Sequence, residues 1–193
     1  DIRKFFDHVD HAILKEILAL RVSDPIARRI IGEIIDSYSV VLAVQDRRNK
    51  DTHRRGIPIG NLTSQIFANI YMNEFDRYVR HGLKPLAYLR YGDDFIIIAN
   101  TESEVGIMRK LAIAFLRSRL CLETHQKNDI LIPVKRGLWF LGVEIFPNGR
   151  RLKQRNWKRA LERVNIDNIS SYSGLIKQHS TEKQVKGFQW TFL

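Results

Sequence analysis

The stretch Pro85–Asn100 reads PLAYLRYGDDFIIIAN and holds the strongest structural signal in the chain. Its two apolar runs, LAYLRY and FIIIA, are rich in the β-branched and aromatic residues that favour strands. Between them, Gly92 and Asp93 have the signature of a two-residue hairpin loop. The sequence therefore predicts an antiparallel hairpin that carries Asp93 and Asp94 at its tip.

Adjacent carboxylates at a hairpin tip repel each other, so each must face water or be neutralised by a cation. An aspartate in a turn is common, and for Asp93 alone a turn role is the simpler interpretation. Hard oxygen ligands of this kind suit Mg²⁺, which takes one or two protein carboxylates and fills its shell with water and substrate phosphates. Asp1, at the start of an aromatic stretch, is a candidate third carboxylate for a two-metal site.

Helical periodicity and capping residues flank the hairpin. Asp10 is a good N-cap for a helix through HAILKEILAL, and Asp24 followed by Pro25 starts a second helix. Longer helices are expected over Leu62–Val79 and from Ser103 to about Leu120. We expect Asp7 to cap the first helix together with Asp10, and His8 and His11 to lie on its surface.

The last third of the chain is predicted to contain more strands and then helices. The tract LIPVKRGLWFLGVEIFPNG at 131–149 predicts two strands, with turns at Arg136–Gly137 and Asn148–Gly149. From Leu152 a basic helix, KQRNWKRALERVN, is followed by a polar break at NISSYSG and another helix. The irregular order of strands and helices favours an α+β fold, with helices packed on one face of a mostly antiparallel sheet.

Composition sets broader limits on the protein class. A chain of 193 residues with 44% hydrophobic residues is long enough for one substantial core. A net charge of +11 indicates a polyanionic partner such as nucleic acid, with a well-solvated surface as the alternative. Cys121 is the single cysteine, which excludes an intramolecular disulfide and suits a reducing cytoplasm. The apolar runs are too short to span a bilayer, so we expect no membrane association.

Three motifs in order carry a family resemblance. DIRKFFDHVDH, GIPIGNLTSQIFANIYMNEFD and YGDD resemble the polymerase core of bacterial, group II intron-like reverse transcriptases, which are RNA-directed DNA polymerases. Further along, KND at Lys127–Asp129 resembles the next motif, FLGVEI at Phe140–Ile145 the primer grip, and the basic tail from Arg150 the start of a thumb. The resemblance implies a polymerase palm at 1–149 and the start of a helical thumb at 150–193. Because the chain opens directly on Asp1, we expect a segment of a longer protein with its fingers largely missing and its thumb truncated.

The second motif narrows the resemblance. Most group II intron-like enzymes have Gln-Gly and Ser-Pro where this chain has Ile59-Gly60 and Ser64-Gln65. The form IGNLTSQ resembles the reverse transcriptases of diversity-generating retroelements, which copy a template RNA with frequent errors at adenines. An apolar side chain in place of a hydrogen-bonding amide implies a looser check on base-pair geometry.

The resemblance also implies residue roles. Asp1 and Asp93 would bridge two Mg²⁺ ions, or Mn²⁺, with Asp94 assisting, and Lys127 would protonate the leaving pyrophosphate, although a surface lysine is the simpler interpretation. Phe6 would lie under the sugar and exclude a ribose 2′-hydroxyl, and the nucleotide site would also contain Ile59, Gly60 and Gln65. The candidate nucleic-acid-binding residues are Arg54, Arg55, Tyr91, Leu141, Gly142 and Lys158. Trp157, next to Lys158, fits a nucleic-acid contact and a packing role in the thumb equally well.

The expected partners are a template RNA, a DNA primer, deoxynucleoside triphosphates and a basic accessory protein, in a prokaryotic or phage cytoplasm. Three alternatives stay open. The template system can be that of a group II intron or a retron, the enzyme can be an RNA-dependent RNA polymerase, or the chain can be a catalytically inactive fragment that binds nucleic acid.

Overall fold

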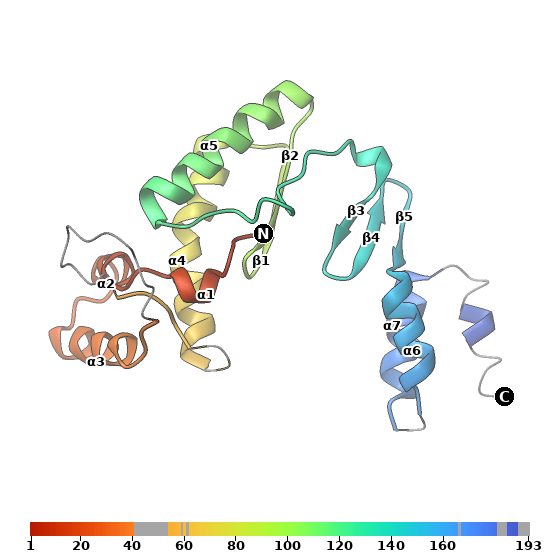
Figure 1. Ribbon diagram of the computed structural model, residues 1–193, viewed down its shortest axis with the longest axis horizontal. Helices are drawn as coiled ribbons and strands as arrows, with labels where there is room; N and C mark the ends of the chain where they lie inside the picture. The colour runs from red at the N-terminus through yellow and green to blue at the C-terminus, as the bar shows by residue number, and fades with distance from the viewer. Residues whose placement is uncertain (41–53, 59, 61, 166, 181–184, 189–193) are drawn as a thin grey trace. The chain divides into compact units, whose positions relative to one another are not determined.

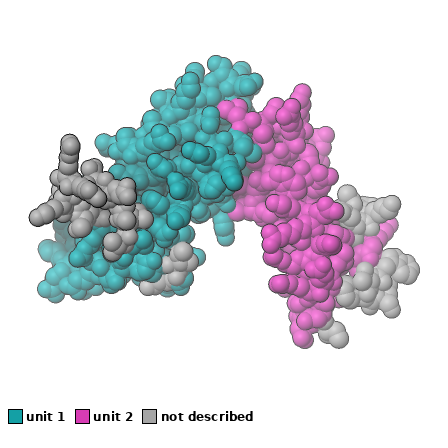
Figure 2. Space-filling view, viewed as in Figure 1, with its two compact units in different colours: residues 1–130 teal, residues 131–193 magenta. Residues whose placement is uncertain are grey.

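The computed structural model describes residues 1–40, 54–58, 60, 62–165, 167–180 and 185–188 (Figure 1). The chain divides into two compact units, residues 1–130 and 131–193, which Figure 2 shows in different colours. Each unit has an apolar core of its own. The assignment of 1–149 to a palm and 150–193 to a thumb remains a prediction.

Unit 1 combines helices with one hairpin, as Figure 1 shows. Its α-helices are α1 (Phe5–His8), α2 (His11–Ala19), α3 (Pro25–Asp36), α4 (Leu62–Arg77) and α5 (Glu102–Leu120). A π-helical turn, Tyr78–Leu83, follows α4, so the helix predicted over Leu62–Val79 changes its geometry near its end. The strands are β1 (Ala87–Tyr91) and β2 (Asp94–Ile98).

The predicted helix starts are confirmed by their caps. The Asp10 carboxylate accepts hydrogen bonds from the backbone N–H groups of Ala12 at 2.9 Å and Ile13 at 3.2 Å. Asp24 caps α3 in the same way, two and three residues ahead, with Pro25 in the first turn. Each cap satisfies donors that the first helical turn leaves unpaired.

The predicted hairpin is also confirmed. β1 and β2 pair antiparallel, with Ala87 opposite Ile98 and Tyr91 opposite Asp94. The hairpin packs on α4 through aromatic rings, because the Phe75 ring lies 5.0 Å from that of Phe95 in an edge-to-face arrangement. Such pairs add to the free energy gained from burial alone. The α+β class with antiparallel pairing therefore holds, and in unit 1 the sheet is a two-stranded hairpin.

The predicted surface position of His11 is wrong. The side chain is buried, its Nε2 donates to the carbonyl oxygen of Gly56 at 2.7 Å, and its Nδ1 lies 3.4 Å from Oδ1 of Asp36. Both partners are distant in sequence, so helical periodicity could not reveal them. Asp7 lies inside the short helix α1, and Asp10 is the residue that caps α2.

Tyr71 joins three helices at the centre of unit 1. It is fully buried on α4, its hydroxyl donates to the Leu120 carbonyl at the end of α5 at 2.7 Å, and it lies 3.4 Å from the backbone nitrogen of Asp10. Burial raises the pKa of this phenol well above its usual value.

Tyr71→Phe is expected to lower the free energy of unfolding by about 1–3 kcal/mol, because it leaves a buried carbonyl without its donor. Urea denaturation of the intact protein measures the change. The matched control is Tyr91→Phe, since Tyr91 is 68% exposed and its hydroxyl is not needed for packing. Equal stability of the two variants would contradict the assigned role of the Tyr71 hydroxyl.

Unit 2 contains a small antiparallel sheet followed by helices. A 3₁₀ turn (Val134–Arg136) precedes the sheet, whose strand order is β3-β4-β5. The strands are β3 (Leu138–Phe140), β4 (Val143–Phe146) and β5 (Gly149–Leu152), and the helices are α6 (Gln154–Arg163) and α7 (Ile169–His179).

The tract 131–149 contains two strands, as predicted, but with other bounds, and a third strand that was not predicted, β5, begins at Gly149. The tract FLGVEI is itself a hairpin, because Leu141 and Gly142 form the loop that pairs Phe140 with Val143. Arg136–Gly137 closes the 3₁₀ turn and is not a hairpin, and Asn148 lies in the loop before β5. The glycines marked turns correctly, whereas the basic sequence of β5 gave no strand signal.

The predicted polar break at NISSYSG is also wrong, because ISSYSG forms the first half of α7. The break lies earlier, where Asn165 and Asn168 exchange hydrogen bonds between side chain and backbone. Ile176 on α7 packs with Leu152 and Ala160 in the core of this unit, and Trp157 packs against them. This burial holds a polar helical segment in place.

Candidate active site

The two adjacent aspartates lie at the turn between β1 and β2. Tyr91 pairs with Asp94, so Gly92 and Asp93 form the two-residue loop, and Asp94 is the first residue of β2. Gly92 has a φ of 62°, which a glycine adopts at little cost in the first position of such a loop. Asp93 and Asp94 are both half-buried.

Asp1 is held by the segment that follows α5. Ile2 forms an antiparallel bridge with Thr124, and the backbone N–H of His125 donates to the Asp1 carbonyl at 2.9 Å. The side-chain amide of Asn128 donates to Oδ2 of Asp1 at 2.5 Å. This bond orients the Asp1 carboxylate, and it comes from a residue 127 positions away.

The backbone nitrogen of Asp1 lies close enough to the carboxylates of Asp94, Asp93 and Asp129 to interact with their charge. Within the ranges that the structure describes, however, no three His, Cys, Asp or Glu side chains are close enough together to form a ready ligand set.

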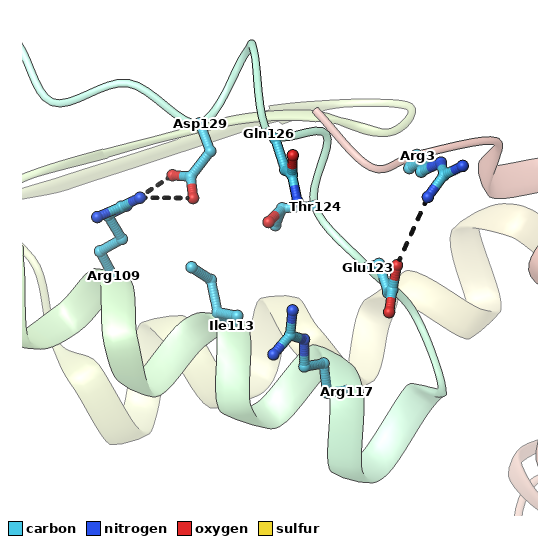
Figure 3. A pocket seen from close by; sticks show the side chains of 8 residues that line it. All are labelled: Arg3, Arg109, Ile113, Arg117, Glu123, Thr124, Gln126 and Asp129. Carbon is cyan, nitrogen blue, oxygen red and sulfur yellow. Dashed lines mark hydrogen bonds and ion pairs between the residues drawn. The ribbon is translucent and has the colours of Figure 1, made fainter.

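Lys127 lies next to Asn128 in the loop that follows α5. Two other residues of this loop, Gln126 and Asp129, line a small pocket. The pocket has a volume of about 220 Å³ and is shown in Figure 3. Arg109 on α5 closes one side, with Nε and Nη2 at 2.7 and 2.9 Å from the two oxygens of Asp129. The lining residues are Arg3, Arg109, Ile113, Arg117, Glu123, Thr124, Gln126 and Asp129. The bidentate pair fastens the loop to α5, while the Lys127 side chain is exposed.

The first two motifs are joined by backbone hydrogen bonds. The N–H of Ile57 donates to the Phe6 carbonyl and that of Gly56 to the Val9 carbonyl, both at 2.8 Å. Phe6 is partly buried, and its ring lies 5.3 Å from the Phe5 ring in an edge-to-face pair. Phe5 is a core residue, so Phe6 is the ring of the pair that retains exposed surface.

The loop that leads into α4 is described in part. Gly60 has a φ of 91°, and a Cβ there would meet no atom within 4 Å, so open space borders this glycine. Gln65 is exposed in the first turns of α4. Ile59 lies outside the described residues.

The two candidate arginines of unit 1 differ in their surroundings. The Arg55 side chain is 24% exposed, with its Nε 3.7 Å from the carboxylate of buried Asp10. The Arg54 side chain is 59% exposed and lies 4.0 Å from Asp36. Arg54 is therefore the more accessible of the two for a phosphate.

The remaining candidates are exposed on their own units. Tyr91 is 68% exposed beside the β1–β2 turn. Leu141 and Gly142, with φ values of 49° and 81°, form a tight turn that leaves the Leu141 side chain 51% exposed. Lys158 belongs to a basic face of α6, whose surface hollow is lined by Gln154, Arg155, Lys158, Arg159, Glu162 and Arg163.

Comparison with known proteins identifies the family. The family model described as "Reverse transcriptase (RNA-dependent DNA polymerase)" matches residues 1–145. The chain belongs to the reverse transcriptase family. A curated relative, Protein YkfC of Escherichia coli (strain K12), is 24% identical, with the match covering 74% of this chain and 44% of that protein. The chain thus spans less than half the length of this relative.

The matched family model describes RNA-dependent DNA polymerases as a family, and the net charge of +11 of this chain is compatible with binding to nucleic acid. No helix in the described ranges is long and apolar enough to cross a membrane.

The reverse transcriptase family uses divalent metal ions, and the donor chemistry here fits them. Asp1, Asp93 and Asp94 offer hard carboxylate oxygens, and Mg²⁺ needs only one or two such ligands when substrate phosphates and waters complete its shell. The role of these three residues as metal ligands stays a prediction.

Sequence reasoning missed two groups of contacts at this candidate site. Asn128 was part of the KND motif, yet its bond to Asp1 could not be read from the spacing. Arg90 and Asp76, which form a bidentate pair beside the hairpin turn, were not singled out. An arginine directly before the Tyr-Gly-Asp-Asp stretch was the available signal.

Proposed function

We propose that this chain carries the catalytic centre of an error-prone reverse transcriptase that builds DNA on an RNA template by two-metal nucleotidyl transfer. The observation that carries the proposal is the placement of Asp93 and Asp94 at a tight turn, together with the hydrogen bond by which Asn128 orients the Asp1 carboxylate. The family match supports RNA-directed DNA polymerisation in general.

The proposed chemistry follows from what each residue offers. Two Mg²⁺ ions, or Mn²⁺, would neutralise charge on the attacking 3′-hydroxyl oxygen and on the leaving oxygen of an in-line displacement. Asp1 and Asp93 would hold the metal ions, and Asp94, the first residue of β2, would help to shape their site. Lys127, exposed on the adjoining loop, is the proposed donor of a proton to pyrophosphate.

We assign substrate selection to the first motif, which contains Phe6, and to the second motif, which contains Gly60. Backbone hydrogen bonds join the two motifs. Phe6 would contact the sugar of the incoming nucleotide, because its ring keeps exposed surface beside the segment that leads to Gly60. Gly60 and Gln65 border open space or solvent, which suits contact with a nucleotide. Arg54, Arg55, Tyr91, Leu141, Gly142 and Lys158 are proposed contacts to template or primer.

The general function is tested by primer extension with the intact protein on RNA and DNA templates, with deoxynucleotides and with ribonucleotides. We expect DNA synthesis on RNA that requires a divalent cation. RNA synthesis would favour an RNA-dependent RNA polymerase instead. Salt-sensitive RNA binding without synthesis would favour a nucleic-acid-binding remnant.

The retroelement subtype, in which an accessory basic protein assists copying, rests on the IGNLTSQ loop. In Ile59→Gln, we expect misincorporation opposite template adenine to fall several-fold, since an amide can hydrogen-bond beside the nascent base pair and penalise poor geometry. Sequencing of the DNA product measures the error spectrum. The control variant is Ile66→Gln, a change of the same kind at a 52% exposed position on α4. An unchanged spectrum in Ile59→Gln would favour the group II intron or retron alternative.

A further inference from the structure

A polar cluster links the hairpin to α4 behind the two aspartates. Arg90 on β1 directs Nε and Nη2 at the two carboxylate oxygens of Asp76 on α4, each at 2.7 Å. Tyr88 donates its hydroxyl to Oδ1 of the same carboxylate at 2.6 Å. The Arg90 and Asp76 side chains are only 12% and 18% exposed. A bidentate pair with this burial has one well-defined geometry.

The third nitrogen of the same guanidinium reaches the turn. Nη1 of Arg90 donates to the carbonyl oxygen of Gly92 at 2.8 Å and lies 3.3 Å from Oδ1 of Asn69 on α4. The Gly92 carbonyl belongs to the peptide group whose nitrogen is that of Asp93. Fixing this carbonyl fixes the plane of that peptide, and hence the direction in which the Asp93 side chain leaves the turn.

The charges in the cluster are arranged so that the turn remains anionic. The hydrogen bond with Asp76 is the main reason that the pKa of Arg90 lies above its usual value, so the guanidinium stays charged. Asp76 balances that charge at 2.7 Å, so Arg90 supports the turn through a hydrogen bond without supplying a net cation to Asp93 and Asp94. A metal ion would therefore meet both carboxylates with their charge uncompensated.

We propose that Arg90, held in place by Asp76, is a positioning residue that sets the Asp93 carboxylate for metal binding. The inference rests on the proposed function, because it concerns the same candidate metal region. Neither side chain touches the reacting atoms in this account. Their role is to fix the turn that carries Asp93 against α4. The N-terminal turns of the same helix carry Gln65. A planar fork with three nitrogens is required, since one group must satisfy a carboxylate and a carbonyl at once.

Arg90→Lys is the test variant, because it keeps the positive charge for Asp76 but cannot hold both partners. In the intact protein, we expect the rate of primer extension to fall about 10- to 100-fold and the Mg²⁺ concentration for half-maximal rate to rise by a similar factor, as for residues that orient metal ligands. The matched control is Tyr88→Phe, which removes a hydrogen bond from the same Asp76 carboxylate and leaves the contact with Gly92 intact.

A merely structural role for the cluster would lower the melting temperature of both variants and leave the Mg²⁺ requirement of both unchanged. Positioning predicts that only Arg90→Lys changes the Mg²⁺ requirement. Mn²⁺ binding to the free protein, followed by electron paramagnetic resonance, gives a second readout that needs no synthesis. There we expect Arg90→Lys to bind about tenfold more weakly than the wild type and Tyr88→Phe.

The outcomes separate this inference from the proposed function. A wild type that synthesises DNA, with Arg90→Lys equal to it in rate, Mg²⁺ requirement and Mn²⁺ affinity, would overturn the positioning role alone. A wild type that makes no DNA, yet binds Mn²⁺ with an affinity that depends on Arg90, would overturn the proposed polymerisation and support the positioning role.

Discussion

Asp93→Asn is expected to reduce DNA synthesis by the intact protein on the order of 10³-fold or more. The substitution keeps the size and the turn position of the side chain but removes the anionic oxygen that a divalent cation requires. Metal ions contribute several kcal/mol to stabilising the transition state of phosphoryl transfer, and each factor of ten in rate corresponds to about 1.4 kcal/mol. Single-turnover primer extension on an RNA template measures the loss.

The control for this substitution is Asp167→Asn, which removes one negative charge from an exposed turn of unit 2. We expect its extension rate to match the wild type. Melting temperatures of both variants show whether either has lost its fold. Synthesis by a folded Asp93→Asn at more than about a tenth of the wild-type rate would contradict the role assigned to Asp93.

Phe6→Ala is expected to reduce discrimination against ribonucleotides by about 10- to 100-fold. The edge-to-face pair with Phe5 and the backbone hydrogen bond between Phe6 and Ile57 hold the Phe6 ring, so in the proposed role it would present a fixed surface to the sugar. Removing a packed group from a selective pocket typically costs discrimination of this order. The measurement compares kcat/KM for a deoxynucleotide and the matching ribonucleotide.

The control is Phe5→Leu, which changes the neighbouring ring inside the core. We expect this variant to lose stability, since a buried aromatic side chain is shortened, while its preference for deoxynucleotides stays close to that of the wild type. Undiminished discrimination in Phe6→Ala would remove Phe6 from the nucleotide site.

Local signals explain what could be predicted of the fold. Asp10 and Asp24 cap helices through N–H groups two and three residues ahead, and the Gly92–Asp93 loop needs only its two flanking strands. In each case the physical partners lie within a few residues, so the pattern and the structure report the same interaction.

Distant partners explain what could not be predicted. The buried His11 ring donates to the carbonyl oxygen of Gly56, 45 residues away in the sequence, and lies beside the Asp36 carboxylate, 25 residues away. Strand β5 was missed because Arg150 and Arg151 interrupt the apolar pattern that is typical of a strand. In α7, tertiary burial of Ile176 outweighs the weak helical preference of a serine-rich segment.

The candidate site divides in the same way. Asp93 and Asp94 were located at a turn from local composition, whereas the groups that orient the site are contributed by other elements. Asn128 donates a hydrogen bond to Asp1, which is 127 residues away in the sequence. Arg90 on β1 donates to Asp76 on α4. These contacts depend on how the helices and the hairpin pack, which no short motif encodes.

The most direct test of the account is to locate the metal itself. Fe²⁺ substituted for Mg²⁺ in the intact protein, with ascorbate and peroxide, generates radicals that cut the backbone near the bound ion. We predict cuts at Gly92–Asp94, around Asp1 and in the loop of Asn128, all suppressed by excess Mg²⁺ and weakened in Asp93→Asn. Cuts confined to other segments, in protein that synthesises DNA, would contradict the assignment of Asp1, Asp93 and Asp94 as the metal site.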